Sequence, residues 1–157
     1  MSLPLVFAVS GVKNSGKTTL IERLIGAFRA RGHAVAVIKH DGHRFSPDTV
    51  GTDSRRFYDA GAAASAVFDA EKLAVTCRGE TDVERLIAAL SELADVIVLE
   101  GFKSSAYRKV ELVRSGNSDA PVCADAIAYV TDLPLRTEAP RFGFSEAEKL
   151  VDFLLEL

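Results

Sequence analysis

Residues 11–18 read GVKNSGKT and match the pattern GxxxxGK[ST]. An apolar segment, residues 3–9, precedes the pattern, and the apolar residues of 20–28 follow it at helical spacing. A buried strand, a glycine-rich turn and an amphipathic helix form the context in which this pattern binds phosphate. The turn directs backbone N–H groups at phosphate oxygens, and the positive end of the helix dipole lies at the same place. We therefore expect an α/β fold with a phosphate-binding loop at one edge of its sheet.

Strand and helix patterns alternate along the rest of the chain, which favours a mostly parallel sheet. The expected strands are residues 34–38, 66–68, 73–77, 95–100, 109–113 and 126–130. The expected helices are residues 53–60, a helix from the Thr81–Glu84 capping box to Ala94, and a terminal helix from the Ser145–Glu148 capping box to Leu157. Residues 109–113 alternate charged and apolar side chains, as a half-exposed strand does. We predict a P-loop NTPase-like, three-layer α/β fold, with a mostly parallel central sheet flanked by helices, in a single domain of residues 1–157.

The size and composition limit the functions open to the chain. Its 157 residues suit a single domain, and 48% hydrophobic residues are enough to bury a core. A net charge of −3 argues against a nucleic-acid partner. No apolar stretch approaches the roughly 20 residues of a membrane span, and no charged leader precedes one, so we expect a cytoplasmic protein with no membrane partner. Cys77 and Cys123 are too few for a disulfide framework, and we expect both to be buried, reduced thiols.

Polar residues at the ends of the expected strands are candidates for phosphate and metal chemistry. Lys17 of the glycine-rich loop should reach the terminal phosphates of a nucleotide, and the Thr18 hydroxyl should bind Mg²⁺. Glu100 ends a buried strand, so its carboxylate should lie beside the loop, and Gly101 would let the backbone pass close to phosphate. Asp41 follows another strand and is a second candidate ligand of Mg²⁺.

Other polar groups leave alternatives open. His40, Asp41 and His43 could contact nucleotide or substrate, ligate a transition metal, or form a solvated turn. Two basic clusters could bind a second anion or simply face solvent. These clusters are Arg55 with Arg56, and Lys103 with Arg108, Lys109 and Arg114.

Five segments carry a resemblance to a known family: GVKNSGKTTL, KHDGH, GTDSRRFYDAGA, DVIVLEGFK and KVELVR. In this order they resemble the MobB family, the molybdopterin-guanine dinucleotide biosynthesis protein B, from the first strand to about Arg114. The resemblance implies a homodimeric GTP-binding protein of the SIMIBI class of P-loop proteins. Such a protein hydrolyses GTP slowly and assists MobA, the guanylyltransferase that attaches GMP to molybdopterin.

The loop and the resemblance together define an expected site. Its nucleotide ligands would be Gly11, Lys13, Asn14, Ser15, Gly16, Lys17, Thr18, Thr19, Gly101 and Asp132. Its Mg²⁺ ligands would be Thr18, Asp41 and Glu100, and its catalytic residues Lys17, Asp41 and Glu100. The NKxD guanine signature of other GTPases is absent, so Asp132 is the nearest candidate to accept hydrogen bonds from guanine N1 and the exocyclic amine, with a plain turn as the alternative. Lys13 could act across a dimer interface or only add local positive potential.

The expected function is an accessory GTPase of molybdenum-cofactor synthesis, with GTP and Mg²⁺ as cofactors and molybdopterin or its guanine dinucleotide product as a further ligand. A P-loop kinase or ligase of a small metabolite is the first alternative, although no insertion suited to a lid over the acceptor interrupts the chain. A metal-insertion GTPase is the second, in which His40 and His43 would be shared across a dimer with nickel or zinc. The third is a binding module whose affinity for a partner depends on the nucleotide.

Overall fold

The computed structural model describes residues 3–40 and 48–157. The chain forms two compact units, the first made of Met1–His40 with Val83–Leu157 and the second of Asp41–Asp82. We describe each unit by itself. The expectation of one domain over residues 1–157 stays a prediction.

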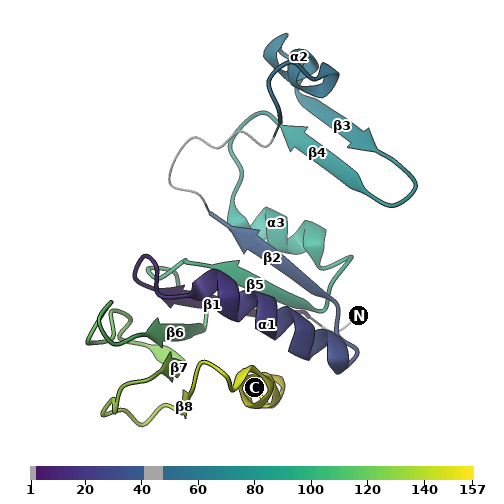
Figure 1. The fold of residues 1–157 in the computed structure, drawn as a ribbon. Helices are drawn as coiled ribbons and strands as arrows, with labels where there is room; N and C mark the ends of the chain where they lie inside the picture. Colours follow the sequence, from purple (N-terminus) through teal and green to yellow (C-terminus); the bar gives the residue numbers. More distant parts are fainter. Residues whose placement is uncertain (1–2, 41–47) are drawn as a thin grey trace. The chain divides into compact units, whose positions relative to one another are not determined.

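A six-stranded sheet forms the centre of the first unit (Figure 1). Its order is β2 (Val35–Lys39), β5 (Val96–Glu100), β1 (Leu5–Gly11), β6 (Lys109–Val113), β7 (Ala126–Thr131) and β8 (Arg141–Phe142). Each strand runs parallel to its neighbours, so the carboxyl ends of all six lie at the same edge. The predicted mostly parallel sheet is therefore confirmed, and the two-residue strand β8 is an addition that the sequence patterns did not indicate.

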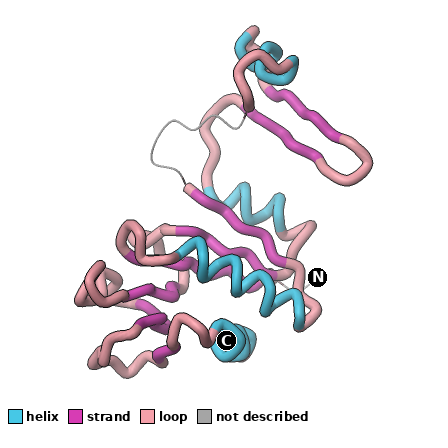
Figure 2. The backbone as a smooth tube through the Cα atoms, in the orientation of Figure 1, coloured by secondary structure: helices cyan, strands magenta, loops and turns pink. Residues whose placement is uncertain are grey.

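Helices cover both faces of this sheet, as the cyan segments of Figure 2 show. On one face, α1 (Lys17–Ala30) and α4 (Ala147–Leu155) bury an apolar cluster with alternate residues of the strands, among them Phe7, Val98 and Leu112. On the other face, α3 (Val83–Leu90) packs on a smaller cluster that includes Ile97 and Leu99. The predicted three-layer α/β fold is confirmed. Because β1 and β5 are buried on both faces, they consist of nearly continuous apolar residues.

Strand β6 is completely buried, which contradicts the prediction that residues 109–113 form a half-exposed strand. Lys109 and Glu111 are each only 1% exposed. The Lys109 ammonium donates to Asp125 Oδ2 at 3.0 Å and to the Tyr107 carbonyl at 3.1 Å. The Glu111 carboxylate accepts hydrogen bonds from the backbone N–H groups of residues 122 and 123, at 2.5 and 3.0 Å. The charged residues of the alternating pattern thus face protein partners instead of water, which satisfies them in a buried position.

Helices α3 and α4 also differ from the sequence prediction at their ends. Helix α3 ends at Leu90 instead of Ala94, and the next residues form a turn in which Leu93 is 75% exposed. Helix α4 has Glu146 and not Ser145 at its N-cap. The Glu146 carboxylate accepts a hydrogen bond from the Gly143 N–H at 2.7 Å, and the N-cap residue makes no side-chain hydrogen bond to the helix.

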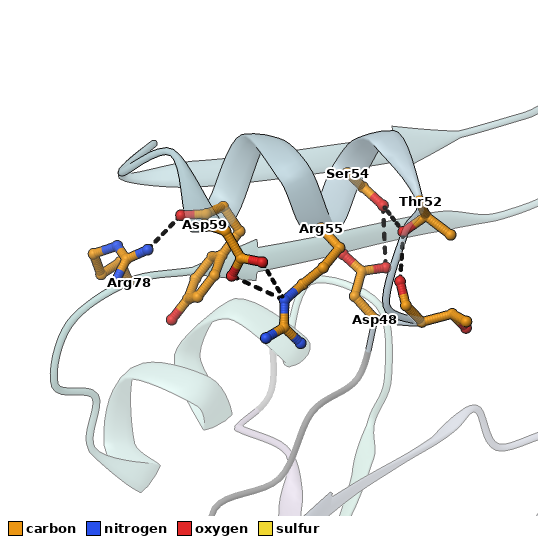
Figure 3. Close-up of polar contacts among 8 residues, drawn as sticks. Asp48, Thr52, Ser54, Arg55, Asp59 and Arg78 are labelled. Carbon is orange, nitrogen blue, oxygen red and sulfur yellow. Dashed lines mark hydrogen bonds and ion pairs between the residues drawn. The ribbon is translucent and has the colours of Figure 1, made fainter.

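The second unit contains α2 (Asp53–Asp59) and the antiparallel hairpin of β3 (Ala64–Phe68) and β4 (Leu73–Cys77), which contain the strands expected at residues 66–68 and 73–77. Thr52 occupies the N-cap of α2, but its hydroxyl donates backwards to the Thr49 carbonyl at 2.9 Å (Figure 3). Arg55 Nε pairs with Asp59 Oδ1 at 2.9 Å within the helix.

The two cysteines have different surroundings. Cys123 is buried, as predicted, and burial followed by the charge of Glu111 raises the pKa of its thiol. Cys77 ends the hairpin strand β4 and is exposed, so the prediction of a buried thiol is wrong there. Neither cysteine forms a disulfide.

Candidate functional site

The glycine-rich loop connects the end of β1 to the start of α1, as the sequence predicts. Gly11 has a φ of +148°, and a Cβ atom at this position would lie 2.8 Å from Ser15 Oγ and 2.9 Å from the Leu112 carbonyl oxygen. Gly16 has a φ of +99° at the N-cap of α1. Both consensus glycines are therefore required by the backbone path of the loop.

This loop lines a cavity of about 380 Å³. The lining residues are Lys13, Asn14, Ser15, Gly16, Lys17, Thr18, Thr19, Lys39 and Glu100. Most of them belong to the loop and the first turn of α1, whereas Lys39 and Glu100 come from the carboxyl ends of β2 and β5. The structure thus brings Glu100 and the predicted loop residues from Lys13 to Thr19 together around one cavity, whereas Gly11 is not among the lining residues.

Lys17 is half-buried, and its ammonium donates to the Val12 carbonyl at 2.8 Å and to the Gly11 carbonyl at 3.2 Å. Burial lowers the pKa of Lys17, the carboxylate of Glu100 opposes this effect, and the positive charges of Lys39 and Lys103 lower the pKa further. Positive charge is therefore concentrated at this end of the sheet, which suits an anionic ligand.

Three oxygen groups of the cavity have the chemistry that phosphate and Mg²⁺ require. The Thr18 hydroxyl lies 3.3 Å from Glu100 Oε1, so a hydroxyl and a carboxylate converge as hard oxygen donors. Ser15 Oγ is buried, and among the residues that the structure describes it has no hydrogen-bond partner. A buried hydroxyl of this kind is normally satisfied, so its environment fits a ligand oxygen at the loop. The residues present therefore fit a phosphate group with Mg²⁺.

Lys39 is a lining residue that the sequence prediction missed. It ends β2, and in the parallel register of β2 and β5 it is the partner of Glu100. Its ammonium lies 3.7 Å from Glu100 Oε1. The sequence could have indicated Lys39, because this residue ends its strand just as Glu100 ends the neighbouring strand. The prediction instead chose Asp41 and His43, which follow Lys39 in the chain.

Gly101 lies directly after Glu100 and is hydrogen-bonded to the end of β1. Its N–H donates to the Val9 carbonyl at 2.9 Å, and its carbonyl accepts a hydrogen bond from Ser10 Oγ at 2.5 Å. Its φ of +95° lies in the region that favours glycine. Gly101 therefore fixes the direction in which the chain leaves the site, although it is not among the residues that line the cavity.

Asp132 lies at the carboxyl end of β7, and it too is outside the cavity lining. Its carboxylate accepts hydrogen bonds from the Ser115 N–H at 2.8 Å and the Ser115 hydroxyl at 2.6 Å, and these bonds lower the pKa of Asp132. Asn117, in the same turn after β6, donates from Nδ2 to the Lys13 carbonyl at 3.1 Å. The turn after β6 therefore contacts both Asp132 and the glycine-rich loop.

The other predicted polar residues have varied outcomes. Asp41 and His43 lie outside the described residues, so their predicted contacts remain predictions. The His40 ring packs edge-on near Phe102, with ring centroids 6.2 Å apart. Over residues 3–40 and 48–157, no three His, Cys, Asp or Glu side chains cluster as a metal site.

The two basic clusters are partly engaged within the protein. Arg56 lies 3.8 Å from Asp53. Lys109 cannot contribute to a surface anion site, because its side chain is buried and its ammonium pairs with Asp125. The Arg114 guanidinium lies over the Phe144 ring, 4.2 Å from its centroid.

None of the described helices is both long and apolar enough to cross a bilayer.

The parallel sheet with flanking helices defines an α/β protein, and its glycine-rich loop between β1 and α1 has the pattern that is typical of phosphate-binding loops. The family model described as "Molybdopterin guanine dinucleotide synthesis protein B" matches residues 6–132, and the chain belongs to this family, MobB. The family suggested by the sequence motifs is therefore confirmed.

Individual relatives agree with this assignment. The chain is 32% identical to the molybdopterin-guanine dinucleotide biosynthesis adapter protein of Escherichia coli over 98% of its own length and 93% of the relative's. It is similar to the crystal structure of Bacillus subtilis MobB, with a TM-score of 0.78, 32% identity and 96% of each chain covered. It is also similar to a MobB homologue from Bacillus stearothermophilus, with a TM-score of 0.72, 27% identity, and 97% and 96% of the two chains covered.

Proposed function

We propose that the chain is an adapter protein in the synthesis of molybdopterin guanine dinucleotide and that it binds GTP with Mg²⁺ at the glycine-rich loop. The observation that carries this proposal is the cavity in which the loop, Thr18 and Glu100 converge, with the Thr18 hydroxyl 3.3 Å from the Glu100 carboxylate. The names of the relatives supply the pathway, and family membership favours this function over a small-metabolite kinase or a metal-insertion GTPase.

The chain's own groups account for phosphate binding. Backbone N–H groups of the loop and the Lys17 ammonium would hold the phosphate oxygens, and Lys17 would leave its carbonyl partners to do so. Thr18 and Glu100 would hold Mg²⁺ together with water, and Asp41 is proposed as a further ligand. When bound, Mg²⁺ neutralises negative charge on the phosphates. We expect hydrolysis to be slow and to depend on Lys17, Glu100 and Asp41.

Guanine recognition is proposed for Asp132. An ionised carboxylate can accept hydrogen bonds from guanine N1 and the exocyclic amine at the same time. The two hydrogen bonds from Ser115 hold the carboxylate in one orientation and favour its ionised form. Because each carboxylate oxygen has a second lone pair, these bonds leave room for the base.

The proposed partner is a MobA-type guanylyltransferase, which the adapter would assist in attaching GMP to molybdopterin, with molybdopterin or its dinucleotide product as a further ligand. The proposed state is a homodimer. Lys13 lines the cavity of its own chain, which supports a contribution in cis to the local positive potential.

Reconstitution with a purified guanylyltransferase, molybdopterin, Mg²⁺ and GTP tests this function. Adding the wild-type chain should increase the yield of the guanine dinucleotide, and adding Lys17→Ala should not, provided that circular dichroism shows the variant to be folded. No increase with the wild-type chain contradicts the adapter role. An equal increase with Lys17→Ala contradicts the involvement of the nucleotide site.

A further inference from the structure

We propose that Lys39 binds the terminal phosphoryl group of the nucleotide and so makes the site prefer a triphosphate over a diphosphate. This inference rests on the proposed nucleotide site and names its specificity-determining residue. Lys39 belongs to β2, a strand that contributes none of the loop residues.

The order of the strands fixes the direction of a bound nucleotide. Because all the strands are parallel, their carboxyl ends form one row in which Lys39 of β2 comes first, Glu100 of β5 second and the glycine-rich loop after β1 third. The turn after β6 and Asp132 after β7 follow on the other side of the loop. A base held at Asp132 therefore places the phosphate chain so that it extends over the loop towards Glu100 and Lys39.

The contacts of Lys39 leave its ammonium available to a ligand. The side chain of Lys39 is 62% exposed, whereas that of Glu100 is only 14% exposed. The 3.7 Å separation of Lys39 Nζ from Glu100 Oε1 is an ion pair that is longer than a normal hydrogen bond. Glu100 also accepts the hydrogen bond of Thr18, and the same pair is the proposed Mg²⁺ site. The Lys39 donors therefore lie beside the residues that would hold Mg²⁺ with the phosphates.

The charges around the cavity agree with this role. Lys13, Lys17 and Lys39 line the cavity, and Glu100 is its one carboxylate among the described residues. Lys39 acts on Lys17 as a like charge, one of the causes that lower the Lys17 pKa. A terminal phosphoryl group adds negative charge where these ammoniums meet. A charge-assisted contact from Lys39 would thus be made by a triphosphate and lost with a diphosphate.

Titration calorimetry with Mg²⁺ tests the inference, using a non-hydrolysable GTP analogue and GDP on the wild type, Lys39→Met, Lys39→Arg and Lys103→Met. Lys103→Met is the matched control, because Lys103 also acts on the Lys17 pKa but is not among the residues described as lining the cavity. For Lys39→Met we expect the Kd of the analogue to rise about tenfold and that of GDP to change less than about twofold. Lys39→Arg should keep the triphosphate preference, and Lys103→Met should change both values by less than about twofold.

The outcomes separate this inference from the proposed function. If the wild type binds both nucleotides and Lys39→Met weakens both equally or neither, the role of Lys39 is wrong and the nucleotide site stands. If Lys103→Met weakens triphosphate binding as much as Lys39→Met does, the loss is a general effect of positive charge. That result would also overturn the contact between Lys39 and the terminal phosphoryl group. If the wild type binds neither nucleotide, the proposed site itself is wrong.

Discussion

Lys109 Nζ lies 3.0 Å from Asp125 Oδ2, and this ion pair joins the buried strand β6 to the segment that precedes β7. The two partners are unequal, because the Lys109 side chain is 1% exposed and that of Asp125 is 66% exposed. Removing one partner of such a pair is costly only when the charge that remains is buried.

Removing Asp125 should therefore destabilise the protein more than removing Lys109. Asp125→Ala leaves a buried ammonium without its carboxylate and should lower the free energy of unfolding by about 2 kcal/mol, a value reduced for the exposure of Asp125. Lys109→Met keeps the apolar stem and leaves an exposed carboxylate, so it should cost less, about 1 kcal/mol or below. Urea unfolding measures both. A greater loss in Lys109→Met than in Asp125→Ala would contradict the asymmetry.

Asp95 should make stability depend on pH at the opposite edge of the sheet. The hydrogen bond with His33 is the main cause that lowers the pKa of Asp95, and the Ala34 N–H also donates to its carboxylate at 2.7 Å. A lowered folded-state pKa stabilises the protein above the ordinary aspartate pKa, and this stabilisation is lost as the pH falls through the lowered value. Asp95→Asn should therefore be less stable than the wild type at pH 6.

The difference between Asp95→Asn and the wild type should begin to shrink below about pH 4, where the aspartate of the unfolded chain becomes protonated while the folded carboxylate, with its lowered pKa, is still ionised. Urea unfolding at pH 6 and pH 3 measures it, and Asp119→Asn, at an exposed carboxylate, is the control. A constant difference at the two pH values would show that the charge of Asp95 contributes nothing.

Glu100→Gln should impair hydrolysis more than binding. Glutamine keeps an oxygen that can accept the Thr18 hydrogen bond but removes the charge that would hold Mg²⁺. We expect the hydrolysis rate to fall about 100-fold and the Kd of Mg²⁺·GTP to rise less than about fivefold, since charge stabilisation matters most in the transition state. Phosphate release and calorimetry measure the two quantities. Unchanged Mg²⁺-dependent turnover would disprove the role of Glu100, and the same comparison applies to Asp41→Asn.

Asp132→Asn should change the preferred base. An asparagine amide can donate to the C2 carbonyl of xanthine but offers only one acceptor to the N–H groups of guanine. The Kd of GTP should rise by at least about tenfold and that of XTP should fall, with Asp119→Asn as the control. Competition binding with GTP, XTP and ATP measures the change. If the GTP and XTP affinities of Asp132→Asn equal those of the wild type, the base is bound elsewhere.

The sequence predicts those parts of the fold in which the local residue pattern matches the burial of the residues in the structure. The loop at residues 11–18 and the buried strand before Glu100 could be assigned because glycine positions and apolar runs have a direct structural cause. The burial of Lys109 and Glu111 could not, because their partners lie in a segment 11–16 residues further along the chain. Alternating charge is usually solvated, and only the tertiary contacts reverse that expectation.

The site shows the same division between local and non-local information. The sequence placed Glu100 beside the loop because a parallel sheet brings the carboxyl ends of its strands to one edge. It could not show that Lys39 is the direct neighbour of Glu100, because the order of the strands in the sheet is not a local property. It also could not show that Ser115 holds Asp132, a contact between the ends of two different strands.

The most direct measurement is calorimetric titration of the wild type and Lys17→Ala with GTP and ATP, each with Mg²⁺. We predict one GTP site per chain in the wild type, weaker binding of ATP, and an affinity for GTP at least about 100-fold lower in folded Lys17→Ala. Removing Mg²⁺ with a chelator should weaken GTP binding to the wild type. An unchanged GTP affinity in Lys17→Ala, or tighter binding of ATP than of GTP by the wild type, would contradict a GTP site at the glycine-rich loop.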